Sequence, residues 1–111
     1  MRARLELPLI ALSLLATTAS DAFAADIAAG KAKAAEACET CHGAGGNSTS
    51  PDFPKLGGQY PDYLAKALRD YKSGDRKNPI MAGFVKPLSK QDIDNLAAYY
   101  AAQPAAVSFK P

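Results

Sequence analysis

The chain has 111 residues, a formal net charge of +2 at pH 7, two cysteines and one histidine. This length fits one small domain, and the near-neutral charge argues against a nucleic-acid-binding protein, in which Lys and Arg cluster. The chain also lacks the ligands for a closed tetrahedral zinc site, because such a site needs four Cys or His side chains.

The first 24 residues have the pattern of a secretory signal peptide. Arg2 and Arg4 precede an apolar run of about a dozen residues, and an A-x-A cleavage motif ends at Ala24. The apolar run is shorter than the roughly 20 residues that a membrane span requires. We therefore expect cleavage after Ala24, export to the periplasm, a mature domain of residues 25–111, and no stable insertion into a membrane, with an uncleaved tether as the alternative.

The mature chain is expected to begin with a helix. Asp26 is a good N-cap, and Ile27, Gly30 and Ala34 recur at helical spacing on an Ala-rich segment that leads to the first cysteine. Glycine inside a helix costs about 1 kcal/mol relative to alanine. Gly30 therefore indicates either a close helix crossing or a glycine that is merely tolerated.

The segment Cys38-Glu39-Thr40-Cys41-His42 is the main functional motif. One helical turn brings both thiols to the same side of the backbone, where each can add to a haem vinyl group, and the imidazole of His42 can then bind the iron. A disulfide in so short a loop adds little stability, and a thioredoxin-like dithiol follows a strand rather than a helix. In an oxidising compartment, free thiols persist only if a cofactor caps them. The motif thus predicts one covalent haem c on Cys38 and Cys41.

The segment of residues 43–58 lacks the periodicity of a helix or a strand and is rich in Gly, Ser and Pro. A long loop in so small a domain is usually functional, and we expect it to wrap one edge of the haem, with a disordered linker as the alternative. A second helix is expected to start near Pro61 and to end at Ser73-Gly74, because charged residues oppose an apolar stripe between them.

Met81 is the candidate for the second axial ligand of the iron. It is the only methionine left once Met1 is removed with the signal peptide, and it follows a proline-bearing segment expected to be a loop. A lone methionine is usually an adaptable core residue. Here His42 is the only imidazole, so a six-coordinate iron needs another ligand. The thioether is the best candidate, and lysine, tyrosine and the terminal amine are poorer ones.

The last helix is expected to follow Ser89, which forms an S-x-x-D capping pattern with Asp92, and to end before Pro104. Apolar residues recur between these limits at helical spacing, and no segment has a comparable strand signal. The domain is therefore predicted to be all-α, with three main helices and loops around one haem. An apolar crevice is expected from Leu56, Leu64, Leu68, Ile80, Phe84 and Leu96.

These residues give the chain a resemblance to the class I cytochromes c, and among them to the small bacterial c553 type and to one half of the dihaem cytochromes c4. The resemblance covers residues 26–103. It implies that Cys38 and Cys41 are the thioether cysteines, that His42 is the proximal ligand, and that Met81 is the distal ligand.

The resemblance also implies roles for residues that do not touch the iron. Pro54 lies where the family uses a proline carbonyl to accept a hydrogen bond from the proximal imidazole, and a ligating imidazole almost always has such a partner. Gly30 and Tyr99 match the contact at which the first and last helices cross. Two departures stand against these matches: Ala34 occupies a position where many relatives have an aromatic residue, and a single Cys-x-x-Cys-His cannot hold the two haems of a complete cytochrome c4.

The resemblance implies one-electron transfer through a haem with His and Met ligands, by an electron-transfer protein and not by an enzyme. The expected partners are redox proteins, with the chain acting as a monomer or as a subunit of a redox complex such as a dehydrogenase. A haem-based ligand binder or weak peroxidase, and a dithiol oxidoreductase without haem, are the alternatives. Lysines flank the ligand segment and would either steer an acidic partner or form only a solvated surface. They are Lys72, Lys77, Lys86 and Lys90.

Overall fold

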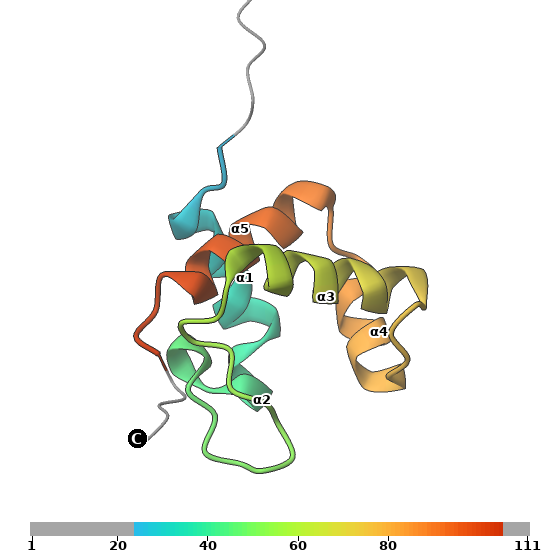
Figure 1. Cartoon of the computed structure of the whole chain (residues 1–111), viewed down its shortest axis with the longest axis horizontal. Helices are drawn as coiled ribbons and strands as arrows, with labels where there is room; N and C mark the ends of the chain where they lie inside the picture. The colour runs from blue at the N-terminus through green and yellow to red at the C-terminus, as the bar shows by residue number, and fades with distance from the viewer. Residues whose placement is uncertain (1–23, 106–111) are drawn as a thin grey trace, which may run out of the picture.

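The computed structural model describes residues 24–105, and all regular secondary structure in this range is helical (Figure 1). The all-α prediction is therefore confirmed. The expected signal peptide lies outside the described residues, except for Ala24. The helices are α1 (Ile27–Ala37), α2 (Glu39–His42), α3 (Pro61–Ser73), α4 (Pro79–Val85) and α5 (Lys90–Ala101), with a 3-10 turn η1 (Ala44–Gly46) after α2.

Helices α1 and α5 cross in direct backbone contact at Gly30. A Cβ atom at this position would lie 2.1 Å from the carbonyl oxygen of Asn95 and 2.9 Å from the Cβ of Tyr99, so only glycine fits. The start of α1 is tied to the same region, because the backbone N–H of Asp26 donates a hydrogen bond to Asn95 Oδ1 at 2.7 Å. The side chain of Asp26 in turn accepts a hydrogen bond from the N–H of Ala29 and caps the helix.

A small apolar core joins α1, α3 and α5. Ala34 has no exposed surface, so α1 contributes a methyl group to the core at this position. The buried apolar residues are Ala34, Leu64, Ala65, Val85, Leu88, Ile93, Leu96, Ala97, Tyr99 and Tyr100.

The ends of α3 and α5 follow from local signals in the sequence. Pro61 occupies the first turn of α3, and Gly74 ends this helix in the left-handed conformation with φ of 87°. Ser89 and Asp92 form a reciprocal capping box: Ser89 Oγ accepts from the N–H of Asp92 at 3.0 Å, and Asp92 Oδ2 accepts from the N–H of Ser89 at 2.9 Å.

The expectation of a proline-bearing loop before Met81 was wrong, because Pro79 is the first residue of helix α4, which also carries Met81. The reason lies in the two residues that precede Ile80. Asn78 caps the helix with its side-chain oxygen, and Pro79 has the fixed φ angle that suits a first helical position. The preceding loop expectation, for residues 43–58, agrees with the structure apart from the short turn η1.

The helices leave α2 and α4 on opposite sides of the molecule. Figure 1 shows α2 and the loop after it on one side and α4 on the other, with α3 and α5 above them in this view. Helices α3 and α5 pack against each other, and α4 packs against α3. Within residues 24–105, none of the helices combines the length and the apolar composition needed to cross a bilayer.

Candidate haem-binding site

A cavity of about 450 Å³ lies between α2 and α4. Its volume falls in the usual range for small-molecule and cofactor sites, which is roughly 300–1,000 Å³. Cys38, Cys41, His42 and Met81 all line it, so the structure brings the four residues proposed to hold a haem into one site.

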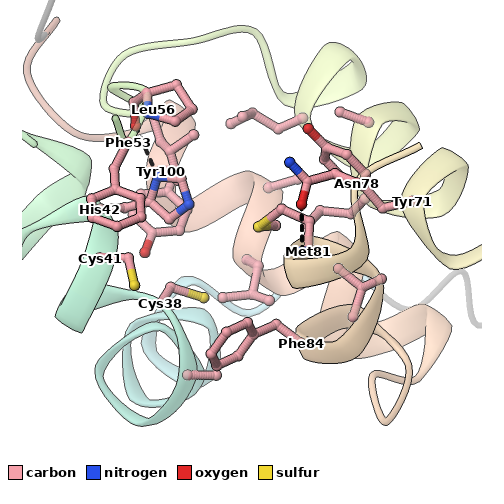
Figure 2. A pocket seen from close by; sticks show the side chains of 18 of the residues that line it. Cys38, Cys41, His42, Phe53, Leu56, Tyr71, Asn78, Met81, Phe84 and Tyr100 are labelled. Atoms are coloured by element: carbon pink, nitrogen blue, oxygen red, sulfur yellow. Dashed lines mark hydrogen bonds between the residues drawn. The ribbon is translucent and has the colours of Figure 1, made fainter. Parts of the chain in front are cut away.

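The two proposed iron ligands approach the cavity from facing walls. In Figure 2 the imidazole of His42 and the sulfur of Met81 point toward one another, and the sulfurs of Cys38 and Cys41 lie on the His42 side. Neither cysteine forms a disulfide. The spacing of the motif in one helical turn explains why both sulfurs accompany the imidazole.

The orientation of His42 is set by the loop that follows it. His42 is buried, and its Nδ1 lies 2.8 Å from the carbonyl oxygen of Pro54. A carbonyl oxygen can only accept, so Nδ1 carries the proton and Nε2 keeps a free lone pair for a metal. The ring of Phe53 also contacts the imidazole edge-on, with ring centroids 6.4 Å apart. These two contacts thus hold the outer side of the His42 imidazole and leave Nε2 available to a metal.

The position of Met81 is set by the cap of α4. The side-chain oxygen of Asn78 accepts hydrogen bonds from the N–H groups of Ile80 and Met81, both at 3.0 Å. These bonds fix the backbone from which the thioether enters the cavity. Sequence reasoning missed the role of Asn78, although Asn followed by Pro is a recognisable helix start.

The walls of the cavity are mostly apolar. All six residues of the expected crevice line it, and Val85, Leu88 and Ala97 are among the other apolar residues of the wall. Ile80 and Phe84, which line the cavity, are 63% and 47% exposed, and we refer to this solvent-exposed part of the lining as the mouth of the cavity.

A cationic side chain lies at the rim of the cavity among aromatic rings. The guanidinium of Arg76 stands 4.8 Å from the ring centroid of Tyr71 and donates a hydrogen bond to the Tyr63 hydroxyl at 3.5 Å. All three residues line the cavity. A fixed cation there suits the carboxylate groups of a haem. No sequence pattern predicts this cluster, because a charged turn usually indicates only a solvent-exposed segment.

A buried hydroxyl lies on the cysteine side of the cavity. Tyr100 is 3% exposed, and its hydroxyl has no hydrogen-bond partner in the described part of the chain. Burial raises the pKa of Tyr100, and it also raises the pKa of the Cys38 thiol, an effect that the neighbouring Tyr100 hydroxyl partly offsets. An unpaired buried hydroxyl costs about 1–3 kcal/mol, and a bound group in the cavity would supply the missing partner.

The donor set fits a covalently bound haem. Two free thiols, an imidazole with a free Nε2, a facing thioether, apolar walls and a cationic rim all open on one cavity. Among residues 24–105, no cluster of three or more His, Cys, Asp or Glu side chains forms another candidate metal site.

The family model for cytochrome c matches residues 27–102, and the chain belongs to the cytochrome c family. Membership in this family implies a covalently bound haem c, in agreement with the two cysteines in the cavity.

Within the family, the chain is similar to the cytochromes c4. It is 51% identical over 84 residues to cytochrome c4 of Pseudomonas aeruginosa, an alignment that covers 76% of this chain and 41% of that protein. Its fold matches the crystal structure of reduced recombinant cytochrome c4 from Pseudomonas stutzeri with a TM-score of 0.68 and 44% identity, over 73% of this chain and 47% of that one. The chain thus spans less than half the length of the cytochromes c4 that it matches.

Two other relatives have names other than cytochrome c4, and this chain covers very different shares of their lengths. Cytochrome c-554(548) of Halomonas halodenitrificans is 39% identical over 83 residues, which cover 72% of this chain and 99% of that protein. The thiosulfate dehydrogenase electron acceptor of Thiomonas intermedia is 43% identical over 67 residues, which cover 60% of this chain and 31% of that protein. One domain of this kind therefore occurs both as almost a whole protein and as part of a longer one.

Proposed function

We propose that this chain transfers single electrons between other redox proteins, as an electron carrier and not as an enzyme. The observation that carries the proposal is the placement of His42 and Met81 on facing walls of a cavity that Cys38 and Cys41 also line. When bound there, haem c supplies an iron that exchanges one electron between its ferrous and ferric states.

Each of the four residues has a distinct task in this proposal. Cys38 and Cys41 hold the cofactor through two thioethers, so that it is not lost outside the cytoplasm. His42 presents Nε2 to the iron because its Nδ1–H is engaged by Pro54. Met81 presents its sulfur from a backbone fixed by the helix cap. Since both ligands are held from behind, a change of charge at the iron needs little movement of the protein.

The apolar walls are expected to raise the reduction potential of a bound haem. They exclude water from the cavity and so disfavour the additional positive charge of the ferric state. A thioether ligand acts in the same direction, because it favours ferrous iron. We therefore expect a higher potential than that of a haem with two imidazole ligands.

Partners are expected to approach the mouth of the cavity, where Ile80 and Phe84 are exposed. Of the flanking lysines, Lys90 is paired with Asp94 at 2.8 Å, which balances its charge. Lys72 and Lys77 donate to backbone carbonyls and keep their net charge. Steering of an acidic partner would thus depend on Lys72, Lys77 and Lys86 and would weaken with salt.

The place of action that we propose is the periplasm, supported by the signal-peptide pattern that ends at Ala24. A second candidate role is that of an electron-transfer subunit that serves a dehydrogenase. The similarity to a thiosulfate dehydrogenase electron acceptor favours this role.

Expression of the full chain with haem-attachment machinery tests the proposal. We expect an intact mass of residues 25–111 plus one haem, a haem c pyridine haemochrome spectrum, and a near-infrared thioether-to-iron band in the oxidised protein. A chain at apoprotein mass would exclude the electron-carrier function. An attached haem without the near-infrared band, which binds carbon monoxide readily when reduced, would instead indicate a ligand-binding protein or a weak peroxidase.

A further inference from the structure

Tyr100 has a buried polar group that the four proposed haem-binding residues leave unused. The residue lies on α5 and lines the cavity, with 3% of its surface exposed and its hydroxyl without a hydrogen-bond partner among residues 24–105. Its neighbour Tyr99 is also buried but lies at the α1 crossing against Gly30 and is not part of the cavity wall. Of these adjacent tyrosines, only Tyr100 faces the cofactor site.

A candidate acceptor for this hydroxyl is the sulfur of Cys38, which lines the same cavity. In Figure 2, Tyr100 lies on the same side of the cavity as the sulfurs of Cys38 and Cys41. Burial raises the pKa of the Cys38 thiol, and the Tyr100 hydroxyl acts in the opposite direction and lowers it. As a thiol, Cys38 has a proton of its own. As a thioether it has none, and its sulfur can then only accept.

The carboxylates of a haem are a less suitable acceptor for Tyr100. They are attached at the porphyrin edge away from the two vinyl groups, and Cys38 marks the vinyl edge. In Figure 2, Tyr71 and Asn78 lie on the wall of Met81, away from both cysteines. Arg76, which stacks on Tyr71, is better placed to meet a carboxylate.

We propose that the Tyr100 hydroxyl donates a hydrogen bond to the thioether sulfur of Cys38 and raises the reduction potential of the attached haem. The inference rests on the proposed function, since it requires haem attachment at Cys38. The hydroxyl dipole points its positive end at the conjugated edge of the cofactor, where it favours the ferrous over the ferric state. The same bond satisfies a hydroxyl that otherwise remains buried and unpaired.

Potentiometry and resonance Raman spectroscopy of the intact holoprotein test this bond. We compare the wild type with Tyr100→Phe and with the matched control Tyr99→Phe, after mass spectrometry has shown one haem per chain in each. Tyr100→Phe should lower the potential by the same amount from pH 5 to pH 8 and should shift the C–S stretching bands. Tyr99→Phe should match the wild type in both measurements.

A second measurement needs no variant at Tyr100. Transfer of the wild-type holoprotein to D₂O should shift a C–S band if an O–H group is bonded to the sulfur. In a Cys38→Ala background, with haem held by Cys41 alone, Tyr100→Phe should no longer change the potential, because the acceptor is gone.

Two results would overturn the assignment. One is a Tyr100→Phe protein, or a D₂O exchange, that leaves the C–S bands and the potential as in the wild type. The other is a potential difference that depends on pH, which would make a haem carboxylate the acceptor. Failure of haem attachment in the wild type would be a different outcome, because it would refute the proposed function itself.

Discussion

The Nδ1 atom of His42 lies 2.8 Å from the carbonyl oxygen of Pro54, twelve positions further along the chain. The loop after the cysteine motif therefore returns to the outer side of the imidazole and supplies its hydrogen-bond acceptor. A partner of this kind fixes the tautomer and the ring plane of a metal-binding histidine and raises its basicity.

Replacement of Pro54 with alanine tests whether the backbone carbonyl or the proline ring of this residue orients His42. The backbone acceptor remains in Pro54→Ala, but the unfolded chain gains freedom, so we expect a loss of about 0.4–1 kcal/mol in the free energy of unfolding. The near-infrared band and the reduction potential should stay close to the wild type. Pro51→Ala, in the same loop, is the control for stability. A large fall in potential in Pro54→Ala alone would show that the ring itself orients His42.

Replacement of Met81 with alanine should leave the haem attached through Cys38 and Cys41 and open the sixth position of the iron. The variant should lose the near-infrared band, have a lower potential, and bind imidazole or carbon monoxide more tightly. Ile80→Ala removes an apolar side chain from the same cavity and should keep the band. An unchanged spectrum and potential in Met81→Ala would mean that another group binds the iron.

The cap of α4 predicts a graded effect at Asn78. Asn78→Ala removes the acceptor for the N–H groups of Ile80 and Met81, so we expect a loss of about 1 kcal/mol in stability and a weaker near-infrared band. Asn78→Asp retains a capping oxygen, so its stability and its near-infrared band should stay close to those of the wild type. Equal loss in the two variants would show that the cap is not what positions Met81.

The helix crossing predicts opposite effects of one substitution at two glycines. Gly30→Ala would place a Cβ 2.1 Å from the Asn95 carbonyl, so the helices must separate, at a cost of about 1–3 kcal/mol or more. At Gly83, within α4, a Cβ meets no atom within 4 Å, and Gly83→Ala should stabilise by about 0.4–1 kcal/mol. Denaturant unfolding measures both. Equal effects at the two sites would refute the close crossing.

Some features of the fold and of the site could be predicted from local sequence, and others could not. The cysteine motif, the caps at Asp26 and Ser89, and the stop at Gly74 depend on residues within one turn of each other, so the sequence alone indicated them. The helical state of residues 79–85 was not predicted, because the segment is short and its main helix signal is the Asn78 cap followed by Pro79.

Other features of the site require parts of the chain that are far apart in sequence. Tyr100 reaches the surroundings of Cys38 only because α5 crosses α1 at Gly30. Arg76 meets Tyr63 and Tyr71 only because the turn after α3 folds back on that helix. No periodicity or motif within a short window indicates contacts of this kind.

The capping box of α5 predicts an effect of pH on stability. The backbone N–H of Ser89 holds the pKa of Asp92 below its ordinary value of 3.8. A lowered folded pKa stabilises the fold above pH 3.8, and this stabilisation is lost as the pH falls through the folded value. At low salt, the free energy of unfolding of the wild type should be higher than that of Asp92→Asn by about 0.3–1 kcal/mol near pH 7. This difference should vanish in acid. A difference that persists at the lowest pH would refute the role of the charge.

Helix α4 carries Met81, yet it packs chiefly against α3 and leaves Ile80 and Phe84 exposed at its surface. The wall that carries His42 is instead joined to the α1 and α5 crossing (Figure 1). Regions with few buried contacts unfold locally at lower free energy, and Val85 is the only buried residue among the 7 of α4, so we expect α4 to open more readily than the helices at the crossing. Backbone amides of α4 would then exchange with deuterium faster than those of α1 and α5, at a rate that also limits entry of small ligands to the iron.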